Sequence, residues 1–180
     1  MIIAIVILVL LVLWGLLGYN SLVRKKNSLE GAWAGIDVQL KRRFDLIPNL
    51  VETVKGYAAH EKEVLEQVTK ARNMVAGAGN AEERMEAENN LGGALGRLIA
   101  VAESYPDLKA NQNFLQLQEE LSTTENNIER ARRKYNDQVM SYRAAIRQFP
   151  TVILARLFNF SEQPYFEAEK QERENVKVKF

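Results

Sequence analysis

The chain opens with an apolar run, "MIIAIVILVLLVLWGLLGYNSLV", that contains no charged side chain before Arg24. As an α-helix, about 22 residues rise roughly 33 Å, which matches the hydrocarbon thickness of a bilayer. A cleaved signal peptide would begin with basic residues and carry small residues at the cut, whereas here no Lys or Arg precedes the run and Leu16 makes Gly18 a poor cleavage site. We therefore predict a retained transmembrane anchor over residues 1–23.

Beyond the anchor, apolar residues recur in alternating steps of three and four, which is typical of long helices packed in coiled-coil fashion. This spacing predicts one helix over 29–76 and, after the "GAGN" break, another over 81–104. Asn80 and Glu83 form a capping box at the start of the second helix. Three glycines inside that helix, in "GGALG", indicate close approach of a neighbouring helix.

The longest helix is predicted over 107–149, because Pro106 suits a helix start and Pro150 ends or kinks the pattern. Its apolar positions keep a heptad phase except for one insertion step between Tyr135 and Val139, and they extend from Ala110 to Phe149. The stretch "TVILARLFNF" that follows is short and strongly apolar.

The lengths of the three predicted helices limit how they can pack together. Unbroken, the three helices are about 70, 36 and 64 Å long, so three antiparallel rods would leave long bare ends. A bend near Ala59–His60 divides the first rod and gives an up-and-down four-helix bundle whose last helix returns to the membrane. The unbroken heptad phase from Tyr57 to Val64 argues against that bend, and the alternative is that bare ends pair between subunits.

We expect an all-α protein in which an N-terminal transmembrane helix precedes long antiparallel, coiled-coil-like helices. The predicted organisation is an anchor (1–23), a basic juxtamembrane segment (24–28), a helical bundle (29–160) and a charged C-terminal tail (161–180).

Charge adds little to this organisation, because Lys+Arg 24 against Asp+Glu 23 leaves a net charge of +1. No overall field attracts nucleic acid, and the runs "KRR" and "RARRK" are interpreted as solvated or ion-paired helix faces. The cluster Arg24-Lys25-Lys26 follows the anchor directly, so the positive-inside rule places the N-terminus outside and the body in the cytoplasm of a single-pass membrane protein.

No catalytic motif is complete. Zero cysteines exclude thiolate nucleophiles and CxxC metal sites. "HEKEV" at His60 lacks the second histidine of a zincin helix because Val64 occupies that place, so His60 is interpreted as a polar surface or turn residue. No GxSxG, Walker or Rossmann pattern occurs. We therefore predict a protein that is not an enzyme, with no catalytic residue, metal or cofactor.

Candidate structural or interaction residues cluster around "QLKRRFDLIPNL". Pro48 lies mid-helix and frees the Phe44 carbonyl, so a kink is expected, and Arg43, at an apolar-phase position, is expected to reach that freed backbone or to snorkel outward. Matching the membrane-proximal ends of the first and last helices predicts interhelical ion pairs that set the register. The predicted pairs are Asp45 with Arg132 or Arg133, and Arg42 with Asp137.

The segment after Pro150 is a candidate membrane-contact surface. A returning last helix would place it beside the bilayer, with Arg156 at the headgroups. The candidate contact residues are Val152, Ile153, Leu157, Phe158 and Phe160. The alternative is that these residues cap the core.

Three stretches, "AWAGIDVQLKRRFDLIPNLVETVKGYAAHE", "YPDLKANQNFLQLQEELSTTENNIERARRKYN" and the later "FP…YFE" pattern, resemble the LemA family of bacterial membrane proteins. The resemblance implies an N-terminal membrane helix followed by a helical bundle. It supplies no catalytic residues, because the biochemical activity of the family is not established. Some relatives are associated with the formation of internal membranes.

These observations together predict a membrane-anchored, non-enzymatic helical scaffold that self-associates and organises or shapes the bacterial membrane. Its expected partners are the lipid bilayer and further copies of the same chain. The alternative is an adaptor or regulator that presents the bundle to another envelope protein, such as a protease or a signalling protein.

Overall fold

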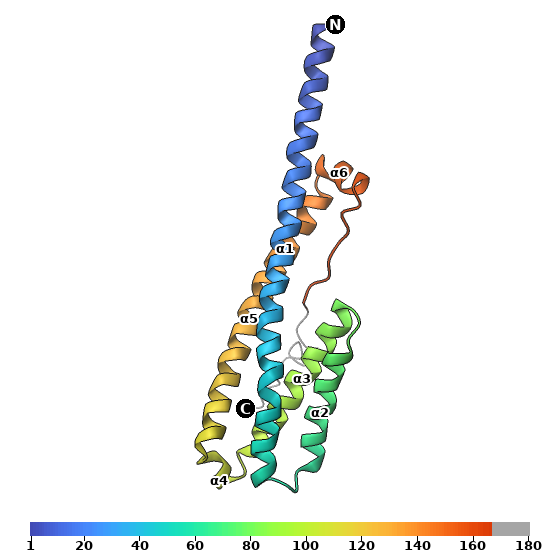
Figure 1. The fold of residues 1–180 in the computed structure, drawn as a ribbon. Coiled ribbons are helices and arrows are strands. Elements are labelled where there is room, and N and C mark those ends of the chain that lie inside the picture. The colour runs from blue at the N-terminus through green and yellow to red at the C-terminus, as the bar shows by residue number, and fades with distance from the viewer. Residues whose placement is uncertain (167–180) are drawn as a thin grey trace, which may run out of the picture. The chain divides into compact units, whose positions relative to one another are not determined.

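The computed structural model describes residues 1–166, and within them the chain is all-α with no strand (Figure 1). The helices are α1 (Ile2–Tyr57), α2 (Lys62–Gly77), α3 (Ala81–Ala102), α4 (Pro106–Lys109), α5 (Gln112–Arg147) and α6 (Thr151–Leu157). The chain divides into two compact units. We call Met1–Asp37 with Arg130–Tyr165 the anchor unit, and Val38–Glu129 the bundle unit.

The predicted first helix is broken between α1 and α2. The Ala58 N–H still bonds the Val54 carbonyl at 2.8 Å, and a turn follows in which the Glu61 N–H bonds the Ala58 carbonyl at 3.0 Å. His60 lies exposed in this turn, as its interpretation as a turn residue required. The bend that the helix lengths predicted is therefore confirmed. The continuous heptad phase argued against it only because both helices have the same apolar periodicity.

Helix α3 begins at the predicted cap. Asn80 Oδ1 accepts from the Glu83 N–H at 2.9 Å, while Glu83 Oε2 accepts from the N–H of Gly79, one residue before the cap, at 2.9 Å. The predicted helix over 107–149 is instead divided, because α4 ends at Lys109 and α5 starts at Gln112. Asn111 causes this second start, since its side chain accepts from the Phe114 N–H at 3.0 Å.

The core of the bundle unit takes buried apolar side chains from α1, α2, α3 and α5, with Leu108 of α4 closing one end. A four-helix arrangement is consistent with this core, and α2 and α3 lie side by side as a hairpin (Figure 1). Tyr57 and Ala110 were predicted to be in the core and are exposed. Both lie where one helix ends and the next has not yet begun.

In the anchor unit, α1 packs antiparallel against α5. The Trp33 ring meets the Tyr135 ring edge-on at 5.4 Å between centroids, and Lys25 Nζ donates to Ser141 Oγ at 2.7 Å. The buried apolar residues of this unit are Leu22, Leu29, Ala32, Ile36, Tyr135, Val139, Tyr142, Ile146, Leu154 and Ala155. The long helix ends before Pro150, as predicted, and Pro150 then precedes the short helix α6. Phe149, predicted in the core, is 76% exposed because α5 has already ended at Arg147.

Candidate functional site

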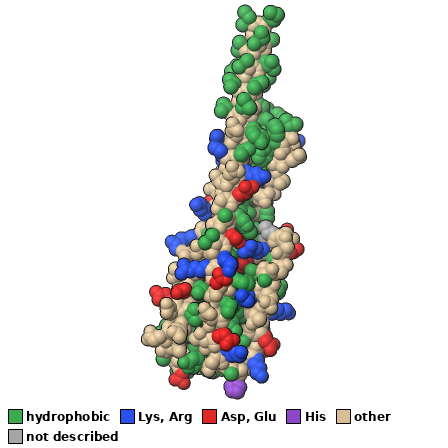
Figure 2. Space-filling view, viewed as in Figure 1, with side chains coloured by type: hydrophobic (Ala, Val, Ile, Leu, Met, Phe, Trp, Pro, Cys, Tyr) green, Lys and Arg blue, Asp and Glu red, His purple; other side chains and the backbone are tan. Residues whose placement is uncertain are grey.

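The N-terminal part of α1 exposes its apolar side chains. This helix is long and apolar enough to cross a membrane, and none of its most apolar window is buried inside the protein. Figure 2 shows hydrophobic side chains around this part of the helix, with Lys and Arg side chains beginning only beyond it. An uncharged helix of this length that exposes most of its apolar side chains is stable in lipid rather than in water. Its length and exposure are consistent with the predicted single-pass anchor.

Helix α6 packs against α1 at the end of that apolar stretch. A β-carbon at Gly18 would lie 2.6 Å from Leu154 Cδ1, so the missing side chain makes room for Leu154. The Tyr19 ring meets the Phe158 and Phe160 rings edge-on, with centroids 4.7 and 5.9 Å away. Gly18 was not recognised in the sequence as a packing position, although a glycine in an apolar helix is a signal for close approach.

The predicted membrane-contact residues divide into two groups. Ile153, Leu157 and Phe158 are exposed, whereas Val152 and Phe160 are partly covered. The residues that anchor the segment to the protein, Leu154 and Ala155, are buried. The segment therefore packs into the core through Leu154 and Ala155 and presents an apolar outer surface through its exposed side chains.

The chain after α6 is tied back onto α5. The Tyr135 hydroxyl donates to the Pro164 carbonyl at 3.0 Å, and Arg143 Nε donates to the Gln163 carbonyl at 2.9 Å. Arg147 donates to both carboxylate oxygens of Glu162, at 2.8 and 2.7 Å. The hydrogen bonds from Arg147, followed by the charges of Arg147 and Arg143, lower the pKa of Glu162 below its usual range and outweigh the opposing effect of burial. Residues 162–165 of the predicted tail are thus attached to α5, and 167–180 lie outside the described residues.

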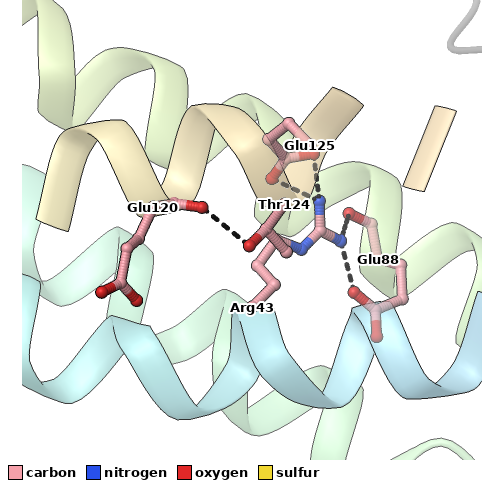
Figure 3. A network of polar contacts seen from close by, with 5 residues as sticks. All are labelled: Arg43, Glu88, Glu120, Thr124 and Glu125. Carbon is pink, nitrogen blue, oxygen red and sulfur yellow. Dashed lines mark hydrogen bonds and ion pairs between the residues drawn. The ribbon is translucent and has the colours of Figure 1, made fainter. Parts of the chain in front are cut away.

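A buried ion cluster lies in the bundle unit and joins three helices (Figure 3). Arg43 of α1 donates through Nη1 to both Glu125 oxygens on α5, at 2.9 and 3.0 Å. Through Nη2 it donates to the Glu88 carbonyl on α3 at 3.0 Å and to Glu88 Oε2. The Arg43 and Glu88 side chains are each 1% exposed, while that of Glu125 is 39% exposed. The guanidinium also passes Gly92, where a β-carbon would lie 3.7 Å from Nη1.

The expectation that Arg43 reaches its own helix backbone or snorkels outward was wrong, because two carboxylates compensate the buried charge. Burial by itself lowers the pKa of Arg43, but the charges of Glu125 and Glu88 and their hydrogen bonds outweigh it and raise the pKa. Within the described residues, Arg43 Nε and Glu88 Oε1 are buried without a hydrogen-bond partner. The cluster therefore contributes more to specifying which helices pack together than to the free energy of unfolding.

The predicted ion pairs of Arg42 and Asp45 were wrong in register. Arg42 Nη2 lies 3.9 Å from Glu120 Oε2, and Asp45 pairs with Lys41 on its own helix. The predicted register aligns the membrane-proximal ends of the two helices, whereas the buried cluster places Glu125, much nearer the start of α5, opposite Arg43. The expected partners Arg132, Arg133 and Asp137 belong to the anchor unit.

Pro48 lies inside α1, which continues through it. The carbonyl it leaves free, that of Phe44, accepts from Arg72 Nε of α2 at 3.5 Å, and the same guanidinium lies 4.0 Å over the Phe44 ring. A cation from the neighbouring helix therefore takes the place of the missing proline N–H. Pro48 is part of the contact between α1 and α2.

The described residues offer little for ligand chemistry. Within residues 1–166 no group of three or more metal-ligating side chains converges. An open groove of about 910 Å³ runs along the end of α1 and along α2. Both acids and lysines line it, among them Glu52, Lys55, Glu66 and Lys70, so it selects no single ligand charge.

Comparison with known proteins places these features in a family. The model of the LemA family matches residues 32–180. The protein LemA of Metamycoplasma hominis is 28% identical over 158 residues, which cover 87% of this chain and 72% of the relative. Magnetosome protein MamQ of Magnetospirillum gryphiswaldense is 25% identical over 177 residues. Magnetosome protein MamQ 2 of Paramagnetospirillum magneticum is 25% identical over 178 residues. Each of these two matches covers 84% of this chain and 65% of the relative. None of these names is that of an enzyme. Because the family model spans most of its length, the chain belongs to the LemA family.

Proposed function

We propose that the protein is a membrane-anchored, non-enzymatic helical scaffold that self-associates and organises the bacterial membrane. The proposal rests on one observation. A single helix, α1, begins as an exposed apolar stretch and ends by supplying core residues such as Leu50 and Val54 to the bundle unit. Helix α1 is therefore both the proposed membrane anchor and one of the helices that pack in the bundle unit.

Two further observations support the scaffold. The groups buried among the helices, Arg43 and Glu88, bind each other, which leaves their charges compensated rather than directed at a substrate. Two relatives are named magnetosome proteins. In this proposal residues 24–28 lie at the cytoplasmic surface, with the N-terminus outside.

The test is the mass of full-length protein extracted directly into native nanodiscs, with imaging of the same particles. We expect closed assemblies of several chains at low expression as well as at high expression. An unrelated single-span protein of similar size, expressed at the same density, controls for accidental co-capture. A uniform monomer would overturn self-association and leave the adaptor, which presents the bundle to another envelope protein, as the better account.

A further inference from the structure

We infer that the segment Phe149–Phe160, which contains α6, inserts into the lipid interface beside α1 and forms a second membrane contact. The inference rests on the anchoring part of the proposed function and is independent of self-association. Its ligand is the bilayer interface, where acyl chains meet anionic headgroups.

The position along α1 at which α6 makes contact shows where α6 would lie relative to the bilayer. Leu154 packs at Gly18 and Phe158 packs at Tyr19, and Tyr19 precedes the first charged residue, Arg24, by five positions. Five residues of helix rise about 7.5 Å. If the apolar stretch fills the roughly 30 Å hydrocarbon layer from residue 2 onward, it ends near residue 21. Helix α6 is therefore held at the boundary between hydrocarbon and headgroups.

The outer surface of the segment has the chemistry that this depth requires. Ile153 is 53% exposed, Leu157 68%, Phe158 51% and Phe149 76%. These four side chains are close together in sequence, and their segment contacts α1 at Gly18 and Tyr19, within its apolar stretch. Arg156 is exposed among them and suits the headgroup layer. In water such a patch would be unfavourable, whereas lipid removes it from solvent.

The segment is also held in place on its far side. Thr151 Oγ1 donates to the Ala145 carbonyl at 2.6 Å, and Arg147 binds Glu162 with two hydrogen bonds. Because α5 therefore holds the chain before and after α6, the apolar side chains are presented without a large loss of conformational freedom on insertion. The exposed apolar side chains of this segment are therefore held in a fixed position, as a surface that binds lipid requires.

Site-specific labelling tests the inference, since the chain has no cysteine of its own. The full-length variant Leu157→Cys carries an environment-sensitive NBD label and is reconstituted into vesicles of equal parts phosphatidylcholine and phosphatidylglycerol. Leu11→Cys reports the anchor, and Val38→Cys, 64% exposed on the same helix, is the water-exposed control. We expect lipids brominated on their acyl chains to quench the labels at 157 and 11 and to leave that at 38 unquenched.

The outcomes separate the two proposals. Quenching at 11 with none at 157 overturns the interfacial contact and leaves the anchor intact, whereas loss at both positions overturns the anchor. A label at 157 that is blue-shifted but unquenched would mean that a second copy of the chain covers it, which also overturns the lipid contact. A second variant, Ile153→Cys, guards against local disturbance by the label, and it must be quenched as Leu157→Cys is.

Discussion

Replacing the buried arginine tests whether the ion cluster sets the fold of the bundle unit. Arg43→Met keeps most of the side-chain stem and removes four hydrogen bonds, two to Glu125 and two to Glu88. The Glu125 carboxylate is 39% exposed and turns to water, whereas Glu88, 1% exposed, is left as a buried charge without its cation. The structural damage therefore concentrates on Glu88.

Removing one partner of a buried pair costs about 3–5 kcal/mol, and this is the loss in free energy of unfolding that we expect for Arg43→Met. The neighbouring variant Arg42→Met is a matched control. Its side chain is 53% exposed and lies 3.9 Å from Glu120, so its loss should stay below about 1 kcal/mol. The double variant Arg43→Met/Glu88→Leu removes both charges and should recover most of the loss.

Urea unfolding of the full-length protein in detergent micelles, followed by helical circular dichroism, measures these differences, provided that the slope of the transition is unchanged. Equal losses for Arg43→Met and Arg42→Met would refute the reasoning. So would a double variant no more stable than Arg43→Met, because the cost would then come from lost packing and not from an uncompensated carboxylate.

Two further predictions concern the anchor unit. Gly18→Ile should displace Leu154 and speed hydrogen exchange in α6, and adding Leu154→Ala to that variant should restore protection. Gly15→Ile is the control and should have no effect, because a β-carbon there meets nothing within 4 Å. Equal exchange in the two isoleucine variants would contradict this prediction. The pKa of Glu162 is lowered in the folded protein, so its stabilising contact with Arg147 is present above the ordinary glutamate value of 4.5 and is lost as pH falls through its own lower pKa. Carboxyl carbon NMR should find the Glu162 midpoint below that ordinary value and shift it upward in Arg147→Gln; an unmoved midpoint would exclude Arg147 as the cause.

Most helix positions were predictable because apolar periodicity and caps act locally. Asn80 and Glu83 predicted the start of α3, and Pro150 predicted the end of the long helix. The break before α5 was missed, although Asn111 is a good N-cap residue, because the apolar phase was followed through it. Glu88 was also missed, although its spacing of three from Leu91 and seven from Leu95 puts it on the core face of α3.

The sequence by itself determined the apolar anchor, the all-α class and the likeness to the LemA family, because composition, period and residue order are properties of the chain alone. Tertiary structure decided which carboxylates Arg43 meets and hence the register of α1 against α5 in the bundle unit. It also decided that Leu154 packs at Gly18 while Leu157 stays outside. Heptad patterns repeat along a helix and fit several registers, and only the burial of particular charges and ring contacts distinguishes one from the next.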